Sequence, residues 1–415
     1  MRNTSVLISG TVVAQAIPIL LQPFLRRFFT PDVFGSYSVY LSIIGIVIML
    51  TSLRYDSAIV LPKKDKDASN LLALVIIVNF IFSLFFLTIV LLFKKSLLNL
   101  LNLKNEFSFL LYLIPAGIFL IGTFQAFNYW LIRKKAFREI SVNKIMRRSV
   151  EGVTQVIFSL FRNSKGLLLG DIAGQIANVV TAFIQAWKKE LRFDKVSFVK
   201  IRYLFYKYSE FPKYNLIPSV MSACSYFMPV IFVNKFYGSE YTGYFDLSRL
   251  LLSLPLALIA SSVSSVLLQK VSESFKSGKS FILELKPVII LISAVSLFGI
   301  IIISLFGVGL FSFLFGKIWG FSGEMSRFMV WSYTLNFIVS SFSTVFIAMR
   351  KIKTYSAWQL FYFIAILLLM LFKNLPFMSF IKIYVLTEVI CYLTATFFIC
   401  KIVFDYEKSR KLILS

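Results

Sequence analysis

The chain has 415 residues, of which 58% are hydrophobic and only 15% are charged. Because soluble domains carry about 25% charged residues, we expect a lipid bilayer to cover the apolar surface of this chain. The sequence contains no histidine, which excludes His-based catalysis and His metal sites. Its net charge is +25, but the cations lie in short segments between apolar runs, as in membrane proteins. No nucleic-acid partner is expected.

Continuous apolar runs of about 20 residues predict transmembrane helices, and they lack the two-residue alternation of a membrane barrel. The fold class is therefore an all-α integral membrane protein with about twelve spans. The expected spans are 5–29, 34–60, 68–93, 108–132, 145–161, 166–187, 214–235, 241–268, 287–315, 327–349, 355–372 and 377–403. The fifth span is the weakest, because Glu151, Gln155 and the flanking Arg147 and Arg148 make it polar.

The Lys and Arg residues of the loops and of the adjoining span ends are distributed unevenly between the two sides. With a cytoplasmic N-terminus, 30 of them lie on the inner side and 11 on the outer side. The positive-inside rule then places both termini in the cytoplasm.

The longest connection, residues 188–213, is basic and aromatic, and we expect it to lie on the inner membrane surface. This linker separates an N-terminal six-helix lobe (1–187) from a C-terminal one (214–403), which a cytoplasmic tail (404–415) follows. Residues 26–35 (RRFFTPDVFG) and 234–243 (NKFYGSEYTG) are similar in character. Since six spans separate them, we expect a parallel repeat.

Charged residues inside spans are costly and are by default candidates for function. Arg26 and Arg27 end the first span after Pro23, where two guanidiniums could hold a pyrophosphate. The alternative is a pair of interfacial residues at the outer edge. Arg54 ends the second span and could catch a lipid phosphate at the mouth of a cavity. Its alternative role is that of a positive-inside residue.

Asp246 and Arg249 lie three residues apart, so they share a helix face and can pair. The pair can be structural, or Arg249 can exchange Asp246 for an anionic substrate. Glu388 in the last span and Glu151 in the fifth are candidates for proton or cation coupling.

Gly170 and Gly174 form a GxxxG stripe in the sixth span, for which we expect close helix packing. Asp171 lies beside this stripe near the outer end, where we expect it to be exposed.

Residues 9–72 closely resemble the opening of the bacterial O-antigen and capsule flippases. These belong to the superfamily of multidrug/oligosaccharidyl-lipid/polysaccharide exporters. The resemblance is carried by Thr30-Pro31-Asp32-x-Phe34-Gly35, Arg54-Tyr55-Asp56 and Leu61-Pro62-Lys63-Lys64, together with Gly10, Gln15 and Pro18. Residues 243–279 look like the eighth span and the following loop of that family. The two segments cover about a quarter of the chain.

The resemblance implies a two-lobed, V-shaped transporter in the bacterial cytoplasmic membrane. It would flip an undecaprenyl-pyrophosphate-linked oligosaccharide repeat unit to the outer leaflet, among membrane lipids and beside a polysaccharide polymerase. Arg26 or Arg27, Arg54 and Arg249 match positions where such proteins carry cavity arginines. No bound cofactor is implied, while coupling to a proton or sodium gradient is open.

Three alternatives remain. A cation-coupled multidrug exporter would share the fold. A membrane enzyme, such as a polymerase or glycosyltransferase, would need a sizeable outer loop, and the outer loops here are short, so we expect no enzyme. A lipid II flippase is expected to carry further helices after the twelfth span.

Overall fold

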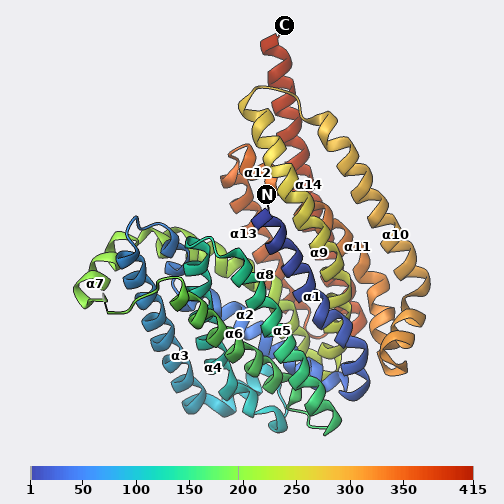
Figure 1. Ribbon diagram of the computed structural model, residues 1–415. Coiled ribbons are helices and arrows are strands. Elements are labelled where there is room, and N and C mark those ends of the chain that lie inside the picture. Colours follow the sequence, from blue (N-terminus) through green and yellow to red (C-terminus); the bar gives the residue numbers. More distant parts are fainter. Residues whose placement is uncertain (1, 195, 415) are drawn as a thin grey trace. The chain divides into compact units, whose positions relative to one another are not determined.

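The computed structural model describes the backbone of residues 2–194 and 196–414, and side-chain burial for residues 10–194, 196–282 and 285–410. Helices form most of this part of the chain, and no strand occurs in it (Figure 1). The long helices are α1 (Arg2–Phe28), α2 (Pro31–Thr51), α3 (Asp65–Leu101), α4 (Phe109–Arg133), α5 (Phe137–Leu160), α6 (Gly166–Lys188), α8 (Glu210–Tyr237), α9 (Ser239–Lys276), α10 (Ile282–Phe315), α11 (Gly320–Phe342), α13 (Ile352–Leu368) and α14 (Phe377–Leu414). The short ones are α7 (Phe198–Lys207), α12 (Thr344–Ala348) and the 3-10 helices η1 (Tyr55–Val60), η2 (Asn105–Phe107), η3 (Lys317–Trp319) and η4 (Leu369–Phe372).

Within the described residues, ten helices are long and apolar enough to cross a membrane, namely the long helices other than α1 and α5. Many of their large apolar side chains face outward, as Phe298 does with 67% of its surface exposed. A bilayer is the solvent that such surfaces require. The prediction of an all-α, multi-pass membrane protein with about twelve helices is confirmed.

The chain forms two compact units, unit 1 (Met1–Gly243) and unit 2 (Tyr244–Ser415). Each is described by itself below. The predicted lobes 1–187 and 214–403, with the linker between them, stay a prediction.

In unit 1, α5 and α6 approach each other closely along the predicted GxxxG stripe. A Cβ atom added to Gly174 would lie 2.9 Å from the Arg147 carbonyl oxygen, and one added to Gly170 would lie 3.0 Å from the Glu151 carbonyl oxygen. Only glycine permits this approach of the two backbones. The close packing is confirmed, but the expectation that Asp171 is exposed was wrong: the residue is 1% exposed, because its stripe faces α5.

The second predicted span, 34–60, was too long. The helix α2 ends at Thr51, and Leu53 and Arg54 both have positive φ angles before η1 begins. The Ser52 hydroxyl donates to Asp56 at 3.0 Å and accepts from the backbone N–H of Arg54 at 3.2 Å. This local hydrogen bonding competes with the helix and ends it.

The two similar segments, 26–35 and 234–243, pack against each other within unit 1. A Cβ atom added to Gly35 would overlap the Ser239 carbonyl oxygen, and one added to Gly243 would overlap that of Pro31. Asp32, in the first turn of α2, accepts a hydrogen bond from the Ser239 hydroxyl and pairs with Lys104 at 2.9 Å. That hydrogen bond and charge raise the pKa of Lys104. The glycines therefore let α2 and the start of α9 cross with their backbones in contact.

In unit 2, α11 packs between α10 and α14. A Cβ atom added to Gly307 would lie 3.1 Å from the Gly323 carbonyl oxygen, so α10 and α11 also meet at small residues. Ser248 of α9 donates to the carbonyl of Ser322 at 2.8 Å, which joins α9 to α11. Glu388 lies in α14, which packs against α11.

The predicted linker contains one further helix, α7. Ile201 and Leu204 of α7 are buried in an apolar core with residues of η1, α3, α4 and α6. Tyr55 donates to the carbonyl of Phe205 at 2.9 Å, and Asn70 accepts from the backbone N–H of Ser197 at 2.9 Å. These contacts hold the helix α7 against the N-terminal end of α3.

Candidate functional site

Arg26 and Arg27 lie in the last turn of α1, where helix ends favour cations. Arg26 is 2% exposed, whereas Arg27 is exposed. The guanidinium of Arg26 stacks 3.9 Å from the centre of the Phe34 ring, and its Nε donates to Gln22 at 2.8 Å. The interfacial alternative therefore fits Arg27 better than Arg26, which is fixed within unit 1.

Arg54 lies at the break between α2 and η1, with a left-handed backbone (φ 63°). Its Nε is buried, and no described residue supplies a hydrogen-bond acceptor or an ion-pair carboxylate for it. The nearby Asp56 is buried and is bound by Ser52 instead. Arg54 is half-buried, and its role in binding an anion stays a prediction.

Glu151 belongs to a buried charged cluster that joins α2, α5 and α6. It is 6% exposed and pairs with Arg148 at 2.7 Å. Asp171 of the neighbouring helix α6 pairs with Arg147 of α5 at 3.4 Å. We call these four residues, with Tyr37 and Tyr40 of α2, the α2–α5–α6 cluster. The tyrosine hydroxyls donate to the cluster's two carboxylates, at 3.5 Å and 3.4 Å.

This cluster holds two carboxylates and two guanidiniums, so its formal charges balance. Balanced pairing makes burial of the charges tolerable. It also places the proposed coupling residue Glu151 between an arginine and a tyrosine, where a change of its charge would disturb both partners.

Glu388 is the centre of a second buried group, in unit 2. It is 5% exposed and accepts hydrogen bonds from the hydroxyls of Tyr384 at 2.8 Å and Tyr362 at 3.1 Å. Tyr362 also contacts the hydroxyl of Tyr392 at 3.2 Å, and Asn336 donates to that hydroxyl at 2.9 Å. We call these five residues the Glu388 cage.

Arg249 is 7% exposed and lies in α9, with its guanidinium 5.5 Å from the centre of the Phe245 ring. Its charge interacts electrostatically with Glu388 and with Tyr384. Arg249 and Glu388, which were predicted as separate features, thus lie in the same unit and their charges interact. Asp246 is half-buried, and its pairing with Arg249 stays a prediction.

Sequence reasoning missed the part that Asp171 and the tyrosines play in these groups. Tyr384 lies four residues before Glu388 on one helix, a spacing that places both on one face. That signal was present in the sequence. Tyr37, Tyr40 and Tyr362 come from other helices, and no local spacing connects them with their carboxylates.

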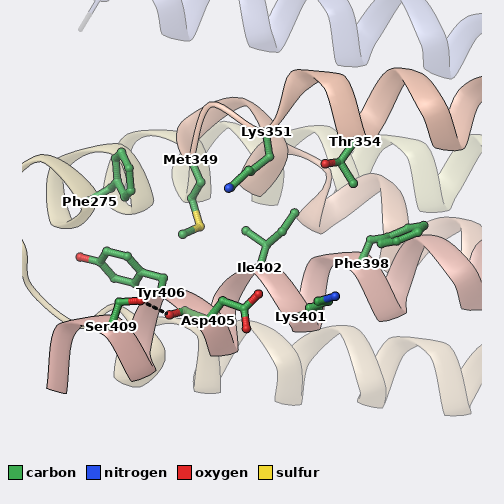
Figure 2. Close-up of a pocket in the computed structure, with 10 residues that line it drawn as sticks. All are labelled: Phe275, Met349, Lys351, Thr354, Phe398, Lys401, Ile402, Asp405, Tyr406 and Ser409. Carbon is green, nitrogen blue, oxygen red and sulfur yellow. Dashed lines mark hydrogen bonds between the residues drawn. The ribbon is translucent and has the colours of Figure 1, made fainter. Parts of the chain in front are cut away.

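A separate pocket of about 530 Å³ lies in unit 2 among the ends of α9, α13 and α14. Figure 2 shows the side chains of Lys351 and Asp405 directed into the space between these helices. Arg249, Asp246 and Glu388 do not line it. None of the predicted site residues therefore lines this pocket.

The chain is similar to one protein family and to several solved structures. Residues 24–324 match the family described as "Polysaccharide biosynthesis protein". A search of curated protein sequences found no significant match. Among solved structures, an inward-facing multidrug resistance MATE family transporter of the MOP superfamily is similar, with a TM-score of 0.74 at 14% identity. The match covers 96% of this chain and 99% of that one.

The lipid II flippase MurJ, in an inward closed conformation, matches with a TM-score of 0.73 at 16% identity, over 98% of this chain and 91% of MurJ. A MOP superfamily transporter from Pyrococcus furiosus matches with a TM-score of 0.63 at 15% identity, over 98% and 96% of the two chains. Identities this low show the fold alone, and these proteins are transporters and flippases, not enzymes. With the family match over most of its length, the chain belongs to the polysaccharide biosynthesis protein family and has the fold of the MOP superfamily transporters.

Proposed function

We propose that the protein is a flippase that moves an undecaprenyl-pyrophosphate-linked oligosaccharide repeat unit from the inner to the outer leaflet of the cytoplasmic membrane. Its product would serve O-antigen or capsule synthesis, beside a polysaccharide polymerase. The match of residues 24–324 to a polysaccharide biosynthesis family carries this proposal. The lipid-linked cargo of MurJ, a protein of the same fold, supports a lipid-linked substrate.

The buried cations support an anionic cargo. A pyrophosphate needs guanidiniums that can form paired hydrogen bonds. Arg54 offers a charge that no described carboxylate neutralises. Arg26 and Arg249 are held by aromatic rings, which orient their guanidiniums. In the proposed cycle the arginines bind the pyrophosphate while the prenyl tail stays in lipid, and the two halves alternate access.

The test is surface polysaccharide in a deletion strain complemented with variants of the chain. Arg249→Ala should abolish surface polysaccharide while the protein is still folded and inserted, because it removes a cation proposed to hold the cargo. Arg327→Ala is the matched control, since Arg327 is exposed on α11 and should retain wild-type polymer. Normal polysaccharide in the Arg249→Ala strain would overturn the assignment.

A cation-coupled multidrug exporter is the second candidate, since the matched MATE protein is described as a multidrug resistance transporter. The Glu388 cage favours it, because a buried carboxylate can bind a cation. The same deletion strain separates the two functions. Unchanged surface polymer with increased susceptibility to cationic drugs would support the exporter and contradict the flippase.

A further inference from the structure

A cavity of about 390 Å³ lies in unit 1 between α7 and the segment that leads into α3. Its lining is rich in lysine, and a single carboxylate, Asp67, faces it. We call it the linker pocket, defined by Leu61, Pro62, Lys63, Lys64, Asp67, Lys200, Leu204, Lys207 and Tyr208. The pocket is separate from Arg54 and from the α2–α5–α6 cluster, which do not line it.

The charge of this pocket is unbalanced. Asp67 pairs with Lys200 at 2.8 Å, which neutralises that lysine. Lys63, Lys64 and Lys207 are exposed, and none of them has an ion-pair partner among the described residues. Three positive charges around one cavity attract an anion.

The other side of α7 carries an apolar surface that no described residue covers. Phe198 is 79% exposed, Val199 78% and Tyr206 63%. The opposite face of the same helix buries Ile201 and Leu204 against unit 1. An amphipathic helix with exposed aromatic and aliphatic side chains beside lysines is typical of a segment that lies in the membrane interface.

The pocket is held in place by contacts that do not involve the side chains of Lys63, Lys64 or Lys207. The rings of Tyr55 and Phe205 lie 5.5 Å apart, and the Tyr55 hydroxyl donates to the Phe205 carbonyl. Asn70 accepts from the backbone at Ser197, just before α7 begins. These three lysines can therefore be changed without removing the contacts that hold α7.

The larger pocket of unit 2 has less excess charge. Lys351 and Lys401 line it together with Asp405 (Figure 2). One carboxylate against two lysines leaves about a single positive charge, where the linker pocket has three. The linker pocket is therefore the stronger candidate for binding an anion.

We propose that the linker pocket binds the phosphate headgroup of an anionic phospholipid of the surrounding membrane. Lysines provide compact charges that suit a phosphate without demanding one geometry. The exposed side chain of Leu61 in the lining faces the glycerol and the start of the acyl chains, and the exposed apolar face of α7 enters the same leaflet. The site goes beyond the proposed transport function and does not depend on the identity of the cargo.

The experiment uses the full chain in non-ionic detergent, with lipid binding measured by native mass spectrometry. The protein is titrated with phosphatidylglycerol and, separately, with phosphatidylcholine. We expect the triple variant Lys63→Gln/Lys64→Gln/Lys207→Gln to bind phosphatidylglycerol about 100-fold more weakly, since each lysine near an anionic surface contributes about fivefold. Its affinity for phosphatidylcholine should stay that of the wild type.

Two matched triple variants complete the test. Lys63→Arg/Lys64→Arg/Lys207→Arg keeps the charge and should keep binding. Lys94→Gln/Lys95→Gln/Lys165→Gln removes the same charge outside the linker pocket, in the C-terminal half of α3 and just before α6. This variant should also bind phosphatidylglycerol like the wild type. The proposal is overturned if the pocket variant retains phosphatidylglycerol, or if the control variant loses it equally. Competition by millimolar inorganic phosphate as strong as that by phosphatidylglycerol would assign a free-anion site instead, and would also overturn the lipid assignment.

Discussion

The carboxylate of Glu388 is held by two hydroxyl donors in a part of the helix bundle that excludes water. Tyr384 reaches it from one turn earlier on α14, and Tyr362 reaches it from α13. Both donors need an acceptor, because a buried hydroxyl without a partner costs about 1–3 kcal/mol. Glu388 therefore contributes to the packing of unit 2 whatever part it plays in transport.

This double role can be separated with a pair of variants. Glu388→Gln keeps an oxygen acceptor for both tyrosines, so we expect the free energy of unfolding in detergent to change by about 1 kcal/mol or less. Glu388→Ala removes the acceptor and should destabilise the protein by about 3 kcal/mol. If Glu388 couples transport to a cation gradient, Glu388→Gln should lose most of the surface polysaccharide despite its near-normal stability. Wild-type polymer with Glu388→Gln would remove Glu388 from the coupling proposal.

Among single residues, the sequence predicts which charged side chains are buried better than it predicts which residues they pair with. Glu151 and Glu388 are candidates because charges inside spans are costly, and both are buried. Asp171 was expected to be exposed, because its position along the helix does not show which face meets α5. Which of Arg26 and Arg27 is buried depends on how α1 packs against its neighbours, and the sequence of α1 alone does not show this.

Helices α2 and α9 depend on glycine where they cross. At Gly35 and Gly243 an added Cβ atom would overlap a backbone carbonyl oxygen of the other segment, and a backbone cannot move aside as a flexible side chain can. The same two positions align in the internal repeat of the sequence. The two similar segments, 26–35 and 234–243, are therefore in physical contact at the glycines that they share.

Replacing either glycine with alanine should separate the two helices. We expect Gly35→Ala and Gly243→Ala each to destabilise the protein by about 3 kcal/mol, since overpacking against backbone is costly. Gly299→Ala is the control, because Gly299 lies within α10 with open space around it and should melt like the wild type or slightly higher. Thermal unfolding of the purified proteins measures the difference. A Gly35→Ala protein as stable as the control would contradict the crossing seen in the structure.

Helix positions were largely predictable, because a run of about 20 apolar residues must be helical in lipid. The ends were less so. The segment after Thr51 contains neither glycine nor proline, yet the helix ends there through hydrogen bonds of Ser52. In α3 the backbone leaves the helical region at Phe93 (φ −117°, ψ 22°), which is the predicted end of that span, and a second helical segment then continues to Leu101.

For the whole molecule, the direction of the chain in the membrane rests on the distribution of its cations. The count of 30 inner against 11 outer basic residues predicts that both termini are cytoplasmic. The proposed lipid site in the linker pocket depends on this orientation as well. A cytoplasmic N-terminus places α7 in the inner leaflet, where anionic lipids attract basic segments.

Site-directed labelling tests this direction on the intact protein. The three cysteines, Cys224, Cys391 and Cys400, are first replaced with alanine. A single cysteine is then placed at Arg162, in the predicted outer loop between α5 and α6, or at Ser277, in the predicted inner loop after α9. Both positions are exposed, so access of the reagent depends on the side of the membrane.

A membrane-impermeant maleimide should label Arg162→Cys in intact cells and should label Ser277→Cys only after permeabilisation. The reason is that basic segments flank Ser277, and the positive-inside rule opposes the translocation of such segments to the outer side. Equal labelling of both variants after permeabilisation controls for reactivity. Labelling of Ser277→Cys in intact cells, with protection of Arg162→Cys, would reverse the orientation and would place the linker pocket in the outer leaflet.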